Sequence, residues 1–298
     1  MTDEPLVSIV IPAYNAAWCV GRAIDSVLAQ TWPHLDLIVV NDGSTDRTTD
    51  VVAAYGARLT CVDQPNAGMS AARNAGIAAA RGEYIAFLDA DDRWQPEKLA
   101  RQMDLMRASD DLAFCSAAAR FESPDGDGLG EWSCPPGGSA TLADIFRNHA
   151  AIAGGASSVL ARTALVRELG GFDAALRGAE DTDLWIRLAA RGRFACIPEP
   201  LVVVLKHPQS VSRNYESMRR GSLTMLRKNR SLLPRELQGA FWRETYAGFL
   251  CDYAKWAYRQ GETRLAVGDV IAAAATAPLA RGRLAASLLL AMATGRRL

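Results

Sequence analysis

The chain has 298 residues, of which 49% are hydrophobic and 22% are charged, a balance typical of a globular protein with a sizeable core. Basic and acidic residues number 33 each, and this zero net charge argues against a general nucleic-acid binder, which needs a basic surface. The six cysteines form no CxxC pair and have no regular spacing, so we expect neither structural zinc nor a disulfide framework.

Short apolar strands alternate with helical patterns over the first hundred residues. Apolar, β-branched runs predict strands at residues 7–11, 35–40, 59–62 and 84–88. The segments between and after them predict helices at residues 19–30, 45–55, 69–80 and 97–108. This repetition predicts an α/β fold with a mostly parallel central sheet and helices on both faces. Ligands of such sheets bind beyond the carboxyl ends of the strands.

The pattern is less regular after residue 110. We expect strands at residues 112–118 and 157–160, a helix at 180–191, and one or two strands within 194–205. Residues 123–138 are rich in glycine and proline and predict a mobile loop. From residue 214 onward the chain is predicted to be helical, including an aromatic-rich segment at 241–258. We therefore place a domain boundary at residue 213, followed by a C-terminal helical region at 214–298.

Two carboxylates follow the strand at residues 84–88. Asp89 and Asp91 are two positions apart, so in an extended chain their side chains point the same way. Two charges about 4 Å apart repel by roughly 1 to 4 kcal/mol, depending on the local dielectric. A bound cation relieves this repulsion, and oxygen ligands favour Mg²⁺ or Mn²⁺. A solvated acidic turn is the alternative, but the position at the ligand edge of the sheet favours the metal.

Four motifs follow one another at residues 7–15 (VSIVIPAYN), 39–46 (VVNDGSTD), 66–76 (NAGMSAARNAG) and 82–92 (GEYIAFLDADD). In order and spacing they resemble the motifs of family 2 glycosyltransferases with the GT-A fold. The resemblance implies a GT-A catalytic domain at 1–213, with a nucleotide-sugar-binding half at 1–110 and an acceptor-binding half at 111–213. It also implies an inverting transfer from a nucleotide-diphosphate donor to a hydroxyl acceptor, in cell-surface polysaccharide or glycolipid biosynthesis.

The resemblance also implies which residues hold the donor. They are Pro12, Tyr14, Asn15, Asp42, Arg73, Asp89 and Ala90. An acceptor carboxylate at Asp42 suits the N–H of uracil, so a UDP-sugar is the expected donor, although other bases fit the same position. Taken singly, Asp42 could be a turn residue before Gly43 and Arg73 a solvated helix residue; their occurrence on one rim favours the binding site.

A divalent metal, Mn²⁺ or Mg²⁺, is the cofactor that the resemblance implies. Asp91 is the expected ligand, Asp89 contacts the ribose or a metal-bound water, and His207, which follows a predicted strand, is a candidate third ligand or a surface histidine. Asp92 is a weaker candidate that is interpreted as a cap of the next turn.

The segment at residues 178–185 (GAEDTDLW) resembles the acidic pair that precedes the acceptor-side helix in the family. The resemblance implies that Asp181 is the general base. Glu180 and Asp183 are the next choices, and Glu180 could instead be a positioning residue. Such a base is needed because the acceptor hydroxyl must lose its proton as it attacks. The alternative is that these carboxylates only stabilise the helix N-terminus.

The C-terminal region alternates basic residues with alanine- and leucine-rich stretches. We favour helices that pack on the catalytic domain or on a second copy of the chain, over a basic amphipathic helix on an anionic membrane. Without an apparent signal peptide or spanning segment, the expected location is the cytoplasm or the inner face of the membrane. The expected partners are a nucleotide-sugar donor and a saccharide or lipid-linked acceptor.

Two other functions compete with this interpretation. A sugar nucleotidyltransferase would need a glycine-rich, basic loop after the first strand, where this chain has residues 12–15 (PAYN). A non-catalytic nucleotide-sugar-binding protein would have lost the metal or base carboxylates, which are all present here.

Overall fold

The computed structural model describes residues 4–148, 151–207 and 214–294. These residues form two compact units. The first comprises Met1–Ala175 and Glu180–Pro208, and the second comprises Leu176–Ala179 and Gln209–Leu298. The boundary expected at residue 213 lies outside the described residues.

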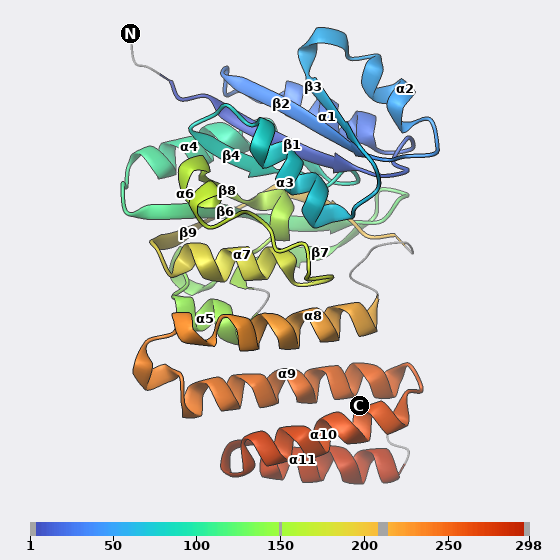
Figure 1. The fold of residues 1–298 in the computed structure, drawn as a ribbon, viewed down its shortest axis with the longest axis vertical. Coiled ribbons are helices and arrows are strands. Elements are labelled where there is room, and N and C mark those ends of the chain that lie inside the picture. The colour runs from blue at the N-terminus through green and yellow to red at the C-terminus, as the bar shows by residue number, and fades with distance from the viewer. Residues whose placement is uncertain (1–3, 149–150, 208–213, 295–298) are drawn as a thin grey trace. The chain divides into compact units, whose positions relative to one another are not determined.

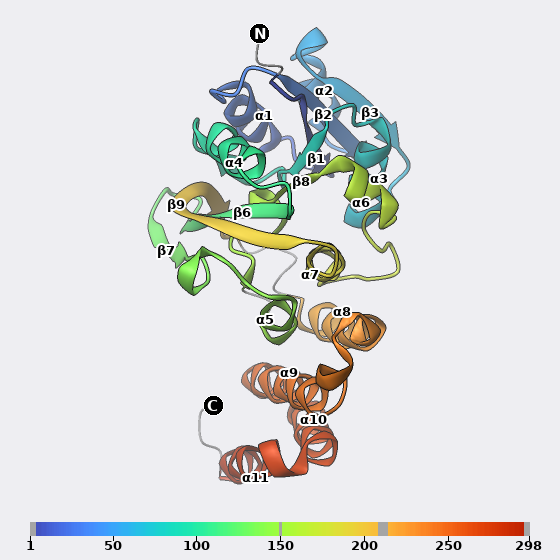
Figure 2. The same ribbon diagram turned by 90° about the vertical axis from the view of Figure 1, so that its left-hand side faces the viewer.

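The first half of the sheet is parallel, as the alternation of strands and helices predicts. Its strand order is β3-β2-β1-β4, formed by β1 (Val7–Ala13), β2 (Leu35–Asp42), β3 (Thr60–Gln64) and β4 (Tyr84–Phe87). The connecting helices are α1 (Val20–Leu28), α2 (Thr48–Ala53), α3 (Met69–Ala79) and α4 (Lys98–Arg107). Helices α1 and α4 cover one face of the sheet and α3 covers the other (Figure 2). The predicted α/β fold is therefore confirmed.

Beyond β4 the sheet becomes mixed. Strand β8 (Leu160–Arg162) runs antiparallel to both β4 and β6 (Leu112–Glu122), and β6 pairs in parallel with β9 (Arg193–Leu205). Helix α6 (Thr163–Glu168) packs beside β8 and α7 (Glu180–Ala189) beside β6, and α5 (Leu142–Arg147) packs against α7 (Figure 1). Antiparallel pairing also adds the short β5 (Arg93–Trp94) to β9. Because β8 reverses the strand direction, the expected parallel arrangement ends at β4.

The expected loop at residues 123–138 contains ordered backbone. Strand β7 (Gly128–Trp132) pairs antiparallel with β6, and a 3₁₀ turn follows at Pro136–Gly138. The expected loop therefore includes a strand, because the backbone of β6 supplies hydrogen-bond partners that the local composition does not reveal.

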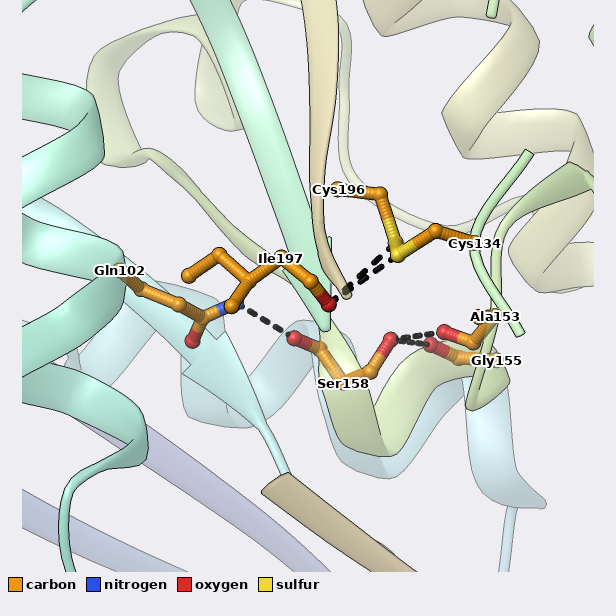
Figure 3. Close-up of a disulfide and its surroundings, with 7 residues drawn as sticks. All are labelled: Gln102, Cys134, Ala153, Gly155, Ser158, Cys196 and Ile197. Carbon is orange, nitrogen blue, oxygen red and sulfur yellow. Dashed lines mark hydrogen bonds between the residues drawn. A yellow bond between two sulfur atoms is a disulfide. The ribbon is translucent and has the colours of Figure 1, made fainter. Parts of the chain in front are cut away.

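One disulfide joins this segment to the sheet. Cys134, after β7, is bonded to Cys196 of β9 across 62 residues of chain, with 5.7 Å between their Cα atoms (Figure 3). We expected no disulfide framework, and this bond was not predicted. The two cysteines meet because Ser139 pairs with Ala195 and holds the segment along β9. The four other cysteines are free.

The second unit is helical, as the sequence predicts. Its main helices are α8 (Tyr215–Lys228), α9 (Ala240–Arg259), α10 (Thr263–Thr276) and α11 (Pro278–Ala293). Leu226, Ala254 and Val270 are fully buried and give this unit its own apolar core. Of the helices in the described ranges, none combines the length and apolar character that a membrane crossing requires.

Close packing of α3 against β1 brings the first two strand ends near the helix that carries Arg73. Gly76 of α3 allows this approach, because a Cβ atom at that position would lie 2.2 Å from Cγ1 of Val10. Such a distance is far inside van der Waals contact, so a side chain would push α3 away from the sheet.

We predict that Gly76→Ala lowers the free energy of unfolding by about 1 to 3 kcal/mol, the usual cost of overpacking a core. Urea denaturation followed by fluorescence measures the change. Gly21→Ala in α1 is the matched control, because its added Cβ would lie 3.4 Å from the Tyr55 hydroxyl, an ordinary contact. Equal stability of the two variants would contradict this account of the packing.

Candidate functional site

Loops beyond β1 and β2 are joined by hydrogen bonds at the predicted rim. The Asn15 carboxamide oxygen accepts a hydrogen bond from the backbone N–H of Thr45 at 2.8 Å, and the Asn15 N–H donates to the Ser44 hydroxyl at 3.0 Å. Asn15 adopts a positive φ of 48°, a conformation that asparagine tolerates better than most residues. Asn15 therefore fixes the position of one loop against the other.

Asp42 organises the segment that leads into α3. It is 3% exposed, and its carboxylate accepts hydrogen bonds from the backbone N–H groups of Ala67 and Gly68, both at 2.9 Å, and from the Gln64 amide at 2.6 Å. Its neighbour along the rim, Tyr14, is 52% exposed just beyond β1. Two other residues predicted to bind the donor pack inward: Pro12 is buried in β1, and Ala90 packs against the hydrophobic core.

Arg73 is a buried cation held between two carboxylates. Its side chain is 2% exposed; it donates to Asp89 Oδ1 at 2.7 Å and to Glu180 Oε1 at 3.3 Å. Its guanidinium also lies 5.1 Å from the ring centroid of Phe172. Burial acts to lower the pKa of Arg73, but Asp89 and Glu180 outweigh it, and the net pKa is raised. Arg73 therefore stays charged, and the alternative of a solvated helix residue is excluded.

Asp181 lies beside this cluster at the start of α7. The chain turns sharply before the helix, with positive φ angles of 88° at Gly178 and 61° at Ala179. One Asp181 oxygen, Oδ1, accepts the backbone N–H of Thr182 at 2.7 Å. Burial, followed by the negative charge of Glu180, raises the pKa of Asp181 to about 6, although Arg73 acts in the opposite direction. This carboxylate can therefore gain and lose a proton near neutral pH.

Asp91 and His207 form the second group at the site. Oδ2 of Asp91 lies 2.8 Å from Nε2 of His207, and the histidine ring packs edge-on against Trp18 with centroids 5.3 Å apart. Burial and the neighbouring charge of Asp89 raise the pKa of Asp91, while His207 lowers it. Excess negative charge at a partly buried position is an environment that a cation would stabilise.

Asp92 ties the acidic turn to the end of β9. Its buried carboxylate accepts hydrogen bonds from the Ser157 hydroxyl at 2.5 Å and from the backbone N–H of Leu205 at 3.0 Å. The Ser157 hydroxyl in turn accepts the N–H of Asp89 at 3.1 Å. Burial, together with Asp91 and Asp89, raises the pKa of Asp92 well above its ordinary value. Since Leu205 ends the strand that precedes His207, Asp92 helps to hold the two metal-ligand candidates together.

The sequence motifs do not single out Trp18 or Ser157, and they indicate only a turn cap at Asp92. Trp18 is 49% exposed, and its place three residues after Asn15 of the predicted rim is the sequence signal that points to it. Ser157 carried no comparable signal, because its partners Asp89 and Asp92 are 68 and 65 residues away in the chain.

The side chains of Asp91 and His207 fit a metal ion that takes its remaining ligands from a substrate. Within the three described ranges, no group of three or more histidine, cysteine, aspartate or glutamate side chains converges as a complete metal site. Asp91 and His207 nevertheless bring a carboxylate oxygen and an imidazole nitrogen to one place. Mg²⁺ and Mn²⁺ commonly bind through one or two protein ligands and complete their shell with waters and phosphate oxygens.

The chain is similar in sequence to known glycosyltransferases. Residues 8–166 match the family described as Glycosyl transferase family 2. An uncharacterized glycosyltransferase of Rickettsia typhi is 33% identical over 197 residues, covering 62% of this chain and 59% of the relative. The putative teichuronic acid biosynthesis glycosyltransferase TuaG of Bacillus subtilis is 36% identical over 149 residues, or 49% of this chain and 58% of that protein. The chain thus spans less than two thirds of the length of either relative.

Two solved structures share the fold. Residues 1–349 of S. aureus TarS align with a TM-score of 0.66 and 20% identity over 92% of this chain and 81% of that one. The mannosyltransferase PcManGT from Pyrobaculum calidifontis, in complex with GDP-Man and Mn²⁺, aligns with a TM-score of 0.65 and 20% identity over 98% of this chain and 81% of that one.

We predict that Asp181→Asn stabilises the protein at alkaline pH. The pKa of Asp181 is about 6 in the fold against an ordinary 3.8, so ionising this group costs folding free energy that is fully present above pH 6. The difference corresponds to about 3 kcal/mol at pH 8 and should shrink as the pH falls through 6 toward 4. Urea denaturation of the wild type and the variant at about pH 8 and about pH 4 measures this difference in the free energy of unfolding. A constant stability difference across that range would refute the raised pKa.

Proposed function

Because the chain belongs to glycosyl transferase family 2 and has the GT-A fold, we propose that it transfers a sugar from a nucleotide-diphosphate donor to an acceptor hydroxyl, with inversion. The observation that carries this proposal is the pair of groups at the carboxyl edge of the sheet. One is the Asp91–His207 pair, and the other is Asp181 beside Arg73. The first suits a cation and a diphosphate, and the second suits removal of a proton.

For the donor we propose a UDP-sugar. Asp42 accepts three hydrogen bonds within the protein, and a carboxylate has about four lone-pair positions, so one remains for the N–H of a uracil base. Tyr14 offers a half-exposed ring on which the base could stack. TarS of S. aureus has been crystallised with UDP-GlcNAc and PcManGT with GDP-Man, so relatives of this fold use more than one base.

Asp91 and His207 would hold the divalent metal, with Asp89 beside them. When bound, the metal would supply positive charge that stabilises the leaving diphosphate. Arg73 holds the Asp89 carboxylate in a fixed position through its 2.7 Å hydrogen bond. Asp92 and Ser157 keep the turn of Asp89 next to the strand end that precedes His207.

Asp181 is the proposed general base. Oδ1 of Asp181 is occupied by the Thr182 N–H, so Oδ2 is the atom proposed to accept the proton. The acceptor oxygen attacks the anomeric carbon, the bond from that carbon to the diphosphate breaks, and the hydroxyl proton moves to Asp181. With a pKa of about 6, Asp181 is mostly ionised at neutral pH yet basic enough to take part. One such displacement inverts the anomeric centre.

For the acceptor we propose a saccharide or lipid-linked saccharide of cell-surface polysaccharide synthesis. The support is the relative from Bacillus subtilis, which is named for teichuronic acid biosynthesis. The segment from β7 to Cys134, tied to β9 by the disulfide, carries Trp132, whose ring stacks near that of Phe121 at 6.1 Å. Aromatic faces of this kind suit sugar rings.

The first test is donor turnover. We predict that the protein releases nucleoside diphosphate from a UDP-sugar in the presence of Mn²⁺, in a panel that also contains GDP- and dTDP-sugars. Asp91→Asn should abolish metal-dependent donor binding in calorimetry, whereas Asp181→Asn should retain binding and lower turnover at least about a hundredfold.

Asp104→Asn, an exposed residue on α4, is the control and should behave as the wild type. Absence of turnover with every donor, combined with absence of metal-dependent nucleotide binding, would reject the proposal. Binding of the donor without turnover would indicate a non-catalytic nucleotide-sugar-binding protein.

The second test is the pH dependence of kcat/KM. The base must be ionised, so activity should fall as the pH drops through about 6. Glu180 raises the pKa of Asp181, so Glu180→Gln should shift this acidic limb to lower pH. Glu168→Gln, an exposed residue paired with Arg191, is the matched control and should leave the limb in place. A limb that does not move in Glu180→Gln would exclude Asp181 as the titrating base.

A further inference from the structure

The second unit contains a pocket that the proposed transfer reaction does not use. It has a volume of about 330 Å³ and lies among α8, α9 and α10. Its lining includes three arginines of α8, namely Arg219, Arg220 and Arg227. This volume is at the small end of the range for ligand pockets, so it suits a compact group.

Arg219 is fixed in the pocket wall by a buried carboxylate. Its Nε donates to Oδ2 of Asp269 at 2.7 Å, and a terminal nitrogen donates to the other oxygen of the same carboxylate. Asp269 is only 3% exposed, and this two-point contact raises the pKa of Arg219. The charge of Arg219 is therefore balanced within the protein, and the pair gives the pocket a rigid side.

Arg220 and Arg227 carry positive charge that is not balanced in the same way. Within residues 214–294 of this unit, neither side chain forms an ion pair with a carboxylate. Arg227 is oriented by Tyr246, whose ring centroid lies 4.9 Å from the guanidinium carbon. The pocket as a whole has three arginines and one aspartate, so it has a surplus of two positive charges.

A hydroxyl group lies between these two cations along the helix. Thr224, which also lines the pocket, is four residues after Arg220 and three before Arg227. Residues with these spacings share one face of an α-helix. The face thus presents two guanidinium groups and one hydroxyl to the same space. A group that matches them needs about two negative charges and at least three acceptor oxygens, which describes a phosphate better than a carboxylate.

We propose that this pocket binds a phosphate group, with Arg220 and Arg227 as its cationic ligands and Thr224 as a hydroxyl donor. Arg219 and Asp269 hold the wall of the site and do not neutralise the ligand. The phosphate could belong to a small molecule in solution or to the headgroup of an anionic lipid, since the two share this chemistry.

The test measures phosphate binding by the full-length protein in EDTA without donor, so that its result does not depend on transfer activity. Calorimetry with inorganic pyrophosphate forms one arm. Co-sedimentation with phosphatidylcholine vesicles, with and without about 20% phosphatidylglycerol, forms the other. The double variant Arg220→Gln/Arg227→Gln should lose at least about tenfold in affinity for the probe that binds.

Arg264→Gln/Arg283→Gln removes two exposed arginines from the same unit outside the pocket and is the matched control. It should bind as the wild type does, and circular dichroism should show that both variants retain their helices. Pyrophosphate binding that depends on Arg220 and Arg227 identifies a soluble phosphate ligand, and vesicle binding with the same dependence identifies a lipid headgroup. The proposal is overturned if the wild type binds neither probe, or if the control variant loses as much affinity as the pocket variant.

Discussion

The buried charge of Arg73 is the interaction on which the arrangement of the candidate site depends. This single side chain joins Asp89, at the end of β4, to Glu180, at the start of α7. A guanidinium with almost no contact with water is stable only while its carboxylate partners are in place; removing one partner of a buried ion pair commonly costs about 3 to 5 kcal/mol. The end of β4 and the start of α7 are therefore held in one geometry by the same charge.

A second set of contacts, made by hydrogen bonds of Asp92, also fixes the acidic turn. Asp92 connects the acidic turn to Ser157 and to the backbone at Leu205, so that the chain leading to His207 is fixed near Asp91. Burial, together with the crowding of Asp89, Asp91 and Asp92, raises the pKa values of both Asp91 and Asp92. The fold thus concentrates negative charge at a place where a cation would relieve the repulsion. Such concentration of charge opposes stability and is characteristic of functional sites.

A raised pKa is also found at the other end of the site. Burial and Glu180 raise the pKa of Asp181 to about 6, whereas Arg73 limits the shift. The same arginine that holds Asp89 and Glu180 therefore moderates the basicity of the proposed base. In the second unit, Arg219 pairs with the buried Asp269, and there the surplus charge of the pocket lining is positive.

The sequence by itself determined the α/β class, the order of strands and α-helices up to β4, and the position of Asp89 and Asp91 beyond β4. These follow from local hydrophobic periodicity and from the rule that parallel strands end at one edge. Tertiary structure decided what the local pattern does not contain: the reversal at β8, the pairing of β7, and the Cys134–Cys196 bond. It also decided that Arg73 meets Glu180 across 107 residues and that Asp91 meets His207 across 116. Burial and distant charges set the pKa of Asp181, and both exist only after the chain has packed.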